Sequence, residues 1–160
     1  NKTMRTNIIL TALFIISAVY AGCSTQGNDE KKLPMEIILD GTYSAIEDKR
    51  EVLLNNNEDF QKLMADVYKN LDQLPRIPVV DFNKNSVVAV FIGNRSNGGF
   101  MVSIDSITEG KNLTVNITET TPGSTCMVTD AITRPFTLVK IPKTEAKPVF
   151  KTKQIVKDCQ

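Results

Sequence analysis

The sequence predicts an α+β fold that is mainly antiparallel β, a small sheet or sandwich with one packed helix at about residues 57–71. Two patterns lead to this fold class: apolar residues recur at helical spacing in one segment and alternate with polar residues in several others. With 160 residues, of which 41% are hydrophobic and 23% charged, the chain has the composition of one globular domain. We expect that domain to span residues 34–160.

The helix is predicted by a capping signal followed by an apolar stripe. Residues 55–59 read Asn-Asn-Asn-Glu-Asp, which supplies an N-cap and places acidic residues in the first turn. The residues Phe60, Leu63, Met64, Val67 and Leu71 then fall on one face of a helix. Pro75 and Pro78 end the segment, and the stripe is typical of core packing.

The strands are predicted mainly from residue 86 onward. Residues 87–92 are uninterrupted apolar and rich in β-branched side chains, which indicates a central strand buried on both faces. Residues 109–112 have the composition of a hairpin turn. The other candidate strands are residues 35–39, 43–46, 51–54, 100–105, 113–118, 136–141 and 149–156.

The first 22 residues have the pattern of a signal peptide. Lys2 and Arg5 precede an apolar stretch over residues 8–19, which as a helix spans about 18 Å and is shorter than the roughly 30 Å hydrocarbon core of a bilayer. The following Tyr20-Ala21-Gly22-Cys23 resembles the lipobox of bacterial lipoproteins. The resemblance implies cleavage before Cys23 and lipidation of Cys23; the alternative is an ordinary secretory signal with an incidental cysteine.

A lipidated Cys23 predicts attachment to a membrane through acyl chains. Residues 24–32 contain no apolar side chain, so residues 23–33 are expected to be the lipidated cysteine and a flexible linker. This organisation predicts a lipid-anchored protein of the bacterial cell envelope, at the outer membrane. The inner membrane remains an alternative, and the face of the membrane that the domain occupies and its oligomeric state are left open.

The composition disfavours most catalytic and ligand-binding classes. There is no histidine, and the net charge is +1, so the sequence lacks the base of Ser-His-Asp and Cys-His sites and the basic excess of nucleic-acid-binding proteins. Its carboxylates show no spacing that selects an acid/base pair. We therefore expect no catalytic residues, no metal, no cofactor and no nucleic-acid partner.

Two cysteines remain after Cys23. Outside the cytoplasm disulfides persist, so Cys126 and Cys159 are expected to form one bridge that ties the end of the chain to a central loop. The alternative is two separate thiols.

Three segments in the C-terminal half carry a family resemblance. Residues 93–100 join polar and glycine residues to an aromatic one, residues 120–126 contain Pro-Gly before a cysteine, and residues 133–142 run from Thr-Arg-Pro-Phe to Ile-Pro. In this order, over about residues 87–142, they resemble the C-terminal domain of the PrcB family, subunits associated with a bacterial surface protease complex. The resemblance implies a lipoprotein that acts as partner, or as assembly or stabilising subunit, of an envelope protease, without catalytic residues of its own.

The loops of these segments are the candidate partner-binding residues. A structural alternative is that they only form turns, with positive φ at Gly98 or Gly99 and a type II turn at Pro122-Gly123. A functional alternative is a proteinase inhibitor, because residues 94–100 and 134–136 also resemble the loops of chagasin-type inhibitors. The candidate residues are Asn94, Arg95, Ser96, Asn97, Gly98, Gly99, Phe100, Pro122, Gly123, Arg134, Pro135 and Phe136.

Overall fold

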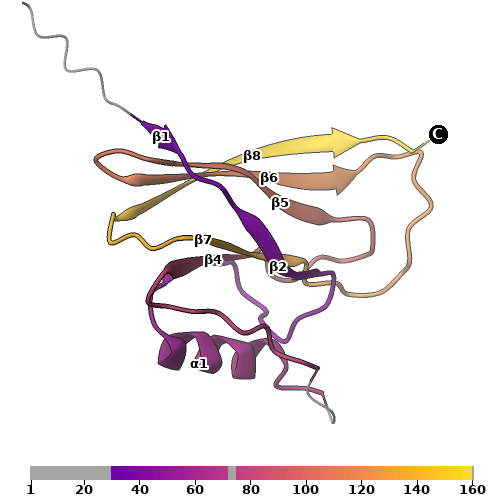
Figure 1. The fold of residues 1–160 in the computed structure, drawn as a ribbon. Helices are drawn as coiled ribbons and strands as arrows, with labels where there is room; N and C mark the ends of the chain where they lie inside the picture. Colours follow the sequence, from indigo (N-terminus) through magenta and orange to yellow (C-terminus); the bar gives the residue numbers. More distant parts are fainter. Residues whose placement is uncertain (1–29, 72–74, 160) are drawn as a thin grey trace, which may run out of the picture.

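Two four-stranded sheets and one helix form three layers (Figure 1). The computed structural model describes residues 30–71 and 75–159. The helix-side sheet has the order β2-β7-β4-β3 and the outer sheet the order β1-β5-β6-β8. The predicted fold class, α+β with mainly antiparallel strands and one packed helix, is confirmed.

The strands are close to those that the sequence predicts. The helix-side sheet consists of β2 (Glu36–Gly41), β3 (Arg50–Leu54), β4 (Asn85–Phe91) and β7 (Phe136–Pro142), and all its pairs are antiparallel. The outer sheet consists of β1 (Lys31–Lys32), β5 (Met101–Glu109), β6 (Leu113–Pro122) and β8 (Pro148–Lys157). The β5–β6 hairpin closes at residues 109–112, as predicted, with the Gly110 amide donating to the Asn112 carbonyl at 3.0 Å.

Strand β4 lies in the middle layer and is covered on both faces. Val87, Ala89 and Phe91 belong to the core beneath the helix, while Val88 and Val90 belong to the core between the sheets. All five side chains are fully buried. A strand covered on both faces has no solvent side that requires polar residues, which explains its uninterrupted apolar sequence.

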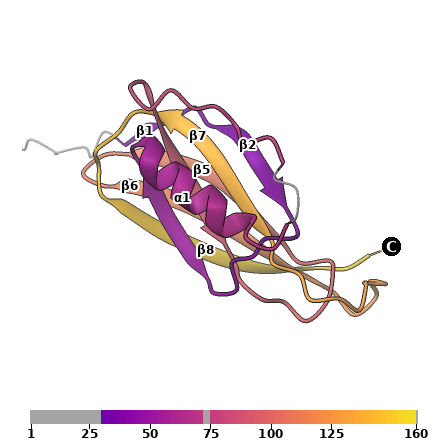
Figure 2. The ribbon, with the colours of Figure 1, turned by 90° about the horizontal axis from the view of Figure 1, so that it is seen from below.

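Helix α1 (Asn57–Val67) crosses the outside of the helix-side sheet (Figure 2). Its N-cap is Asn56, whose side chain accepts a hydrogen bond from the Asp59 amide at 2.8 Å. The helix ends four residues before the predicted residue 71. The cause is tertiary: the Ala45 amide donates to the Val67 carbonyl at 2.8 Å, and the Leu71 amide donates to Tyr68 instead.

Strand β8 runs parallel to β6, although every other pair is antiparallel, and the sequence predicted no direction for it. Two further predictions about elements are wrong. Residues 43–46, a candidate strand, form the irregular connection between β2 and β3. The predicted linker over residues 23–33 overlaps the domain, because Lys31 and Lys32 pair with β5 and Leu33 is buried.

No helix within residues 30–71 and 75–159 has both the length and the apolar character needed to cross a membrane.

Candidate protein-binding surface at the loop end

The loops that connect β2 to β3, β4 to β5 and β6 to β7 converge at one end of the sandwich. We call this end, formed by residues 42–49, 92–100 and 123–135, the loop end; in Figure 1 it lies on the side of the C-terminus. Backbone hydrogen bonds join the loops: Arg95 and Thr133 exchange a pair at 2.8 and 3.0 Å, and the Gly98 amide donates to Thr129 at 2.9 Å. The three sequence segments that carry the PrcB resemblance are therefore neighbours in space.

Arg95 contacts the buried carboxylate of Glu119 rather than extending into solvent. Its Nη2 lies 3.3 Å from Glu119 Oε2, and its guanidinium carbon lies 5.8 Å from the centre of the Phe100 ring. Lys49 Nζ contacts the other oxygen of Glu119 at 3.0 Å and Glu51 at 3.1 Å. Burial alone lowers the pKa of Lys49, but the hydrogen bonds and charges of Glu119 and Glu51 outweigh it, so this pKa is raised.

Sequence reasoning missed Glu119, although its position carries a signal. Leu113, Val115 and Ile117 alternate on the inward face of β6, and Glu119 is the next residue on that face. Its side chain is only 8% exposed. A carboxylate that continues an apolar strand face predicts cationic partners, here Arg95 and Lys49.

Arg134 is likewise engaged inside the loop end. Its Nε donates to Asn94 Oδ1 at 2.6 Å, and its Nη2 lies 3.1 Å from Glu47 Oε1. The Asn94 amide also donates to the Glu47 carbonyl at 2.9 Å. These contacts link all three loops, so Arg134 positions the surface before it meets any partner.

The remaining residues of the β4–β5 loop differ in accessibility. Asn94, Ser96 and Gly99 are exposed, whereas Asn97 and Phe100 are half-buried. The Asn97 carbonyl accepts a hydrogen bond from Thr133 Oγ1 at 2.8 Å. Ser96 is thus an exposed polar side chain of this loop, whereas the exposed Asn94 accepts a hydrogen bond from Arg134.

The structure distinguishes the backbone conformations of Gly98, Gly99 and Gly123, which the sequence could not separate. Gly99 has φ of 85°, whereas Gly98 is buried and adopts no positive φ. The predicted type II turn at Pro122-Gly123 is wrong, because such a turn requires positive φ at its third residue and Gly123 has none. Instead, Pro122 ends β6, and Gly123 starts a turn in which its carbonyl accepts from the Cys126 amide at 3.1 Å.

Pro135 and Phe136 do not belong to the exposed surface that the sequence predicts. Both are buried, and Phe136 is the first residue of β7. The Phe136 ring stacks on Phe91, with 5.5 Å between the ring centres. Contact of Phe136 with a protease would require the ring to leave the core, so its burial weighs against the inhibitor alternative.

The predicted disulfide between Cys126 and Cys159 is confirmed. It attaches the segment after β8 to the β6–β7 loop, and hydrogen bonds reinforce this attachment. Thr125 Oγ1 donates to the Cys159 carbonyl at 2.8 Å, and the Gly123 amide donates to the Lys157 carbonyl at 2.9 Å.

A pocket of about 370 Å³ lies beside this bridge. We call it the disulfide pocket; its lining residues are Gly99, Met101, Thr120, Pro122, Cys126, Met127, Val128, Thr129, Lys157 and Cys159. Three of its apolar side chains are open to solvent: Met127 fully, Met101 to 48% and Val128 to 38%. Sequence reasoning missed Met127 and Val128 because residues 127–132 have no periodic pattern, and it placed Met101 only as part of the candidate strand over residues 100–105.

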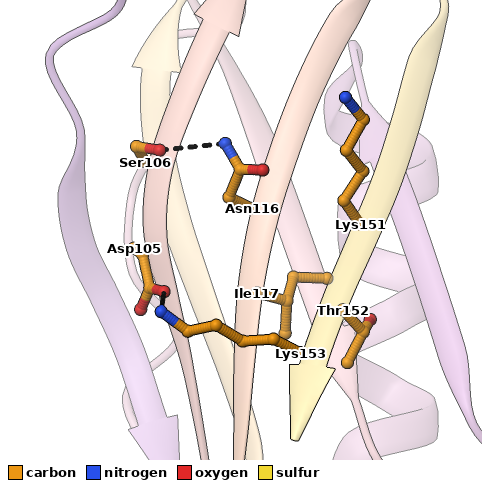
Figure 3. A pocket seen from close by; sticks show the side chains of 7 residues that line it. All are labelled: Asp105, Ser106, Asn116, Ile117, Lys151, Thr152 and Lys153. Carbon is orange, nitrogen blue, oxygen red and sulfur yellow. Dashed lines mark hydrogen bonds and ion pairs between the residues drawn. The ribbon is translucent and has the colours of Figure 1, made fainter.

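A second, polar pocket lies on the outward face of the outer sheet (Figure 3). A bulge in β5 places Asp105 there, where Lys153 Nζ lies 3.0 Å from its carboxylate and Thr118 Oγ1 donates to it at 2.5 Å. The Thr118 hydrogen bond lowers the pKa of Asp105; partial burial opposes this effect and Lys153 supports it. Asn116 Nδ2 donates to Ser106 Oγ at 3.0 Å in the same pocket.

Comparison with known proteins identifies one family. Residues 86–142, about a third of the chain, match the family model described as PrcB C-terminal. The match confirms the resemblance expected over about residues 87–142 and extends from β4 to β7. No curated protein and no solved structure matches the chain.

Proposed function

We propose that this protein is a lipid-anchored envelope protein whose domain binds another protein, as a non-catalytic partner or assembly subunit of an envelope protease. The disulfide pocket is the binding surface in this proposal. The match of residues 86–142 to the PrcB C-terminal model supports it, because that family is linked to the protease complex subunit PrcB.

The observation that carries the proposal is the exposure of apolar side chains around a concave site. Met101, Met127 and Val128 are accessible at the rim of the disulfide pocket, while the β-branched and aromatic residues of the two cores are buried. Apolar side chains gathered around a pocket are typical of binding sites. Methionine suits such a surface because its unbranched side chain adapts to the partner.

The walls of this pocket are held in place before a partner arrives. The β4–β5 loop, the β6–β7 loop and the residues after β8 all contribute to it, and the Cys126–Cys159 bridge joins the last two of these segments. A surface that is ordered in the free protein loses less conformational entropy on binding. A partner would therefore bind segments that are already attached to one another.

The anchor is supported by the sequence pattern at Cys23, which lies outside the described residues. The domain begins with β1 at Lys31, eight positions after Cys23. Eight extended residues reach about 26–29 Å. Under the proposal, the domain stays close to the membrane surface and meets partners that are held at the same membrane.

Site-specific crosslinking in native envelopes tests the proposal. A photoreactive residue at Met127 should trap a subunit of a protease complex, whereas the same residue at Glu58, on the exposed side of α1 and 78% accessible, should not. Replacing both Met127 and Val128 by Asp should remove most of the crosslinked product from a third reporter position, Thr129. A partner trapped equally from Glu58, or a Met127 partner unconnected with proteolysis, would contradict the proposal.

A further inference from the structure

We propose that the free edge of β8 binds an extended, acidic segment of a partner protein by strand addition. This surface is separate from the residues that line the disulfide pocket, apart from Lys157, and it goes beyond the function proposed above. If strand addition at β8 were disproved, the proposal that the disulfide pocket binds a protein would still stand.

Strand β8 is a long edge strand whose outer side is unpaired in the described part of the chain. It pairs with β6 over ten positions, from Leu113–Pro148 to Pro122–Lys157, and it ends the order β1-β5-β6-β8. Residues 151–157 are all exposed. In such a strand, alternate residues point their N–H and C=O groups away from the sheet and are available to another strand.

Strand β8 is held by contacts at its C-terminal end and in its middle. At its last residue the Gly123 amide donates to the Lys157 carbonyl at 2.9 Å, and beyond the strand Cys159 forms the disulfide. In the middle, Lys49 Nζ lies 3.4 Å from Thr152 Oγ1. A strand that is already paired along its other side and attached at its end is a suitable template, because a partner does not have to order it.

The charge of β8 defines the partner. Residues 146–157 contain four lysines and no carboxylate. Lys151, Lys153 and Lys157 stand opposite Asn116, Thr118 and Pro122 in the register, so all three project from the outward face (Figure 3 shows the first two). Lys153 pairs with Asp105 at 3.0 Å, whereas Lys151 and Lys157 make no ion pair with any side chain in the described ranges.

The other face of β8 is more apolar. Phe150 packs against the core between the sheets, and Val156 on the same face is 71% exposed. A strand added to the edge continues both faces of the sheet. The matching partner therefore alternates acidic residues, beside Lys151 and Lys157, with apolar residues that cover Val156.

The same charges disfavour a second copy of this chain as the occupant. Antiparallel pairing of two β8 strands about Gln154 sets Lys151 of each copy opposite Lys157 of the other. Like charges in directly opposed positions destabilise a sheet pair. Lysines on edge strands also protect natural sheets against uncontrolled pairing with other strands. The experiment must therefore distinguish binding of an acidic strand from this purely protective role.

Three labelled peptides test the proposal on the purified full-length protein. Each has ten residues, the length of β8: one alternates Glu and Val, one alternates Lys and Val, and one is the Glu-Val peptide with N-methyl groups on alternate amides. We expect fluorescence polarisation to detect only the first. N-methylation keeps the charge but removes hydrogen bonds that contribute about 0.5–1.5 kcal/mol each, so it should weaken binding by more than about tenfold.

Matched variants locate the site. Lys151→Glu with Lys157→Glu should weaken the Glu-Val peptide by about tenfold, because two favourable cross-strand pairs become repulsive. The control, Lys69→Glu with Lys111→Glu, makes the same charge change at two exposed lysines outside β8 and should change binding by less than about twofold. Bound Glu-Val peptide should also slow hydrogen exchange of alternate β8 amides.

Four results would overturn the proposal. Equal binding of the N-methylated peptide would show charge attraction without strand pairing, and an equal loss in the Lys69/Lys111 variant would show that the site is not β8. If none of the peptides binds, the lysines of β8 only protect its edge against pairing with other strands. Dimerisation through β8 in the peptide-free protein would make a second copy the occupant.

Discussion

Arg95 in the β4–β5 loop and Glu119 in β6 form an ion pair, with 3.3 Å between Nη2 and Oε2, that joins the loop end to the inner face of the outer sheet. The Arg95 side chain is 26% exposed and that of Glu119 is 8% exposed. Arg95 was expected from the sequence to contact a partner, but its guanidinium is occupied within the domain.

Arg95→Ala should lower the free energy of unfolding by about 1–3 kcal/mol, because it removes one of two cationic partners from a buried carboxylate. Urea unfolding measures this change. The control is Arg50→Ala, whose partner Asp66 is 55% exposed, and it should cost less than about 1 kcal/mol. Equal losses in both variants would contradict a structural role for the Arg95–Glu119 pair.

Gly93→Ala should destabilise the domain by at least about 2 kcal/mol. Gly93 has φ of 72°, and a Cβ there would lie 2.6 Å from the Glu47 carbonyl oxygen. Gly110→Ala is the matched control, since its Cβ would lie 3.3 Å from Glu30 Cγ and 3.9 Å from Glu30 Cα, and it should stay within about 0.5 kcal/mol of wild type. Thermal unfolding of the two variants side by side decides the matter; a Gly93→Ala protein as stable as Gly110→Ala would be the contrary result.

Asp105 should make the domain lose stability at acidic pH. Its folded-state pKa lies below the ordinary value because Thr118 donates a hydrogen bond to it, with partial burial opposing and Lys153 supporting the shift. This stabilisation is fully present above the unfolded-state pKa, about 3.9, and is lost as pH falls through the lower folded-state pKa. Denaturant unfolding between about pH 2 and 6 should show this loss in wild type and not in Asp105→Asn.

Thr118→Val provides the companion measurement. It removes the largest cause of the shift, so NMR titration should find the pKa of Asp105 nearer its ordinary value than in wild type. The same Asp105 pKa in both proteins would show that Thr118 does not control it.

The Cys126–Cys159 bridge should contribute about 3–4 kcal/mol to stability in the chain-entropy model. Its sequence separation is 33 residues. Reduction, or replacement of both cysteines by Ser, should lower the urea midpoint accordingly, and the oxidised protein should be lighter by about two hydrogens. Two titratable thiols at these positions in the unfolded, non-reduced protein would rule the bridge out.

Cys23→Ser should release the protein from membranes or leave its signal peptide uncleaved, because the proposed lipid is attached to that sulfur. Membrane fractionation and intact mass measure both effects. A variant with wild-type fractionation and the same mature mass would exclude lipidation at Cys23.

The parts of the fold that could be predicted from the sequence depend on local patterns. The N-cap at Asn56, the apolar stripe of α1 and the two-sided burial of β4 follow from spacing and composition within a few residues. The early end of α1 does not, because the Val67 carbonyl is taken by Ala45, a residue 22 positions earlier. The parallel direction of β8 also leaves no local signal, since parallel and antiparallel strands share the same side-chain period.

The candidate site was only partly predictable. The sequence predicted that residues in three loop segments contact a partner, and the structure places these segments together at the loop end. The sequence could not distinguish side chains that hold the loops together, such as Arg95 and Arg134, from those open to a partner, such as Met127. That distinction depends on Glu47 and Glu119, which lie in other elements. Glu119 alone was accessible to sequence reasoning, through its place on an apolar strand face.

The position of β7 between β2 and β4 determines when the chain can fold. The helix-side sheet cannot form its central pairs before Phe136–Pro142 is available, and β6 gains its second neighbour only with Pro148–Lys157. Pairing of strands so distant in sequence has a large entropic cost of loop closure, and proteins with many such contacts fold slowly. During synthesis, therefore, most of the chain has emerged before either sheet is complete. The two sheets therefore close only after β7 and β8 have both been synthesised.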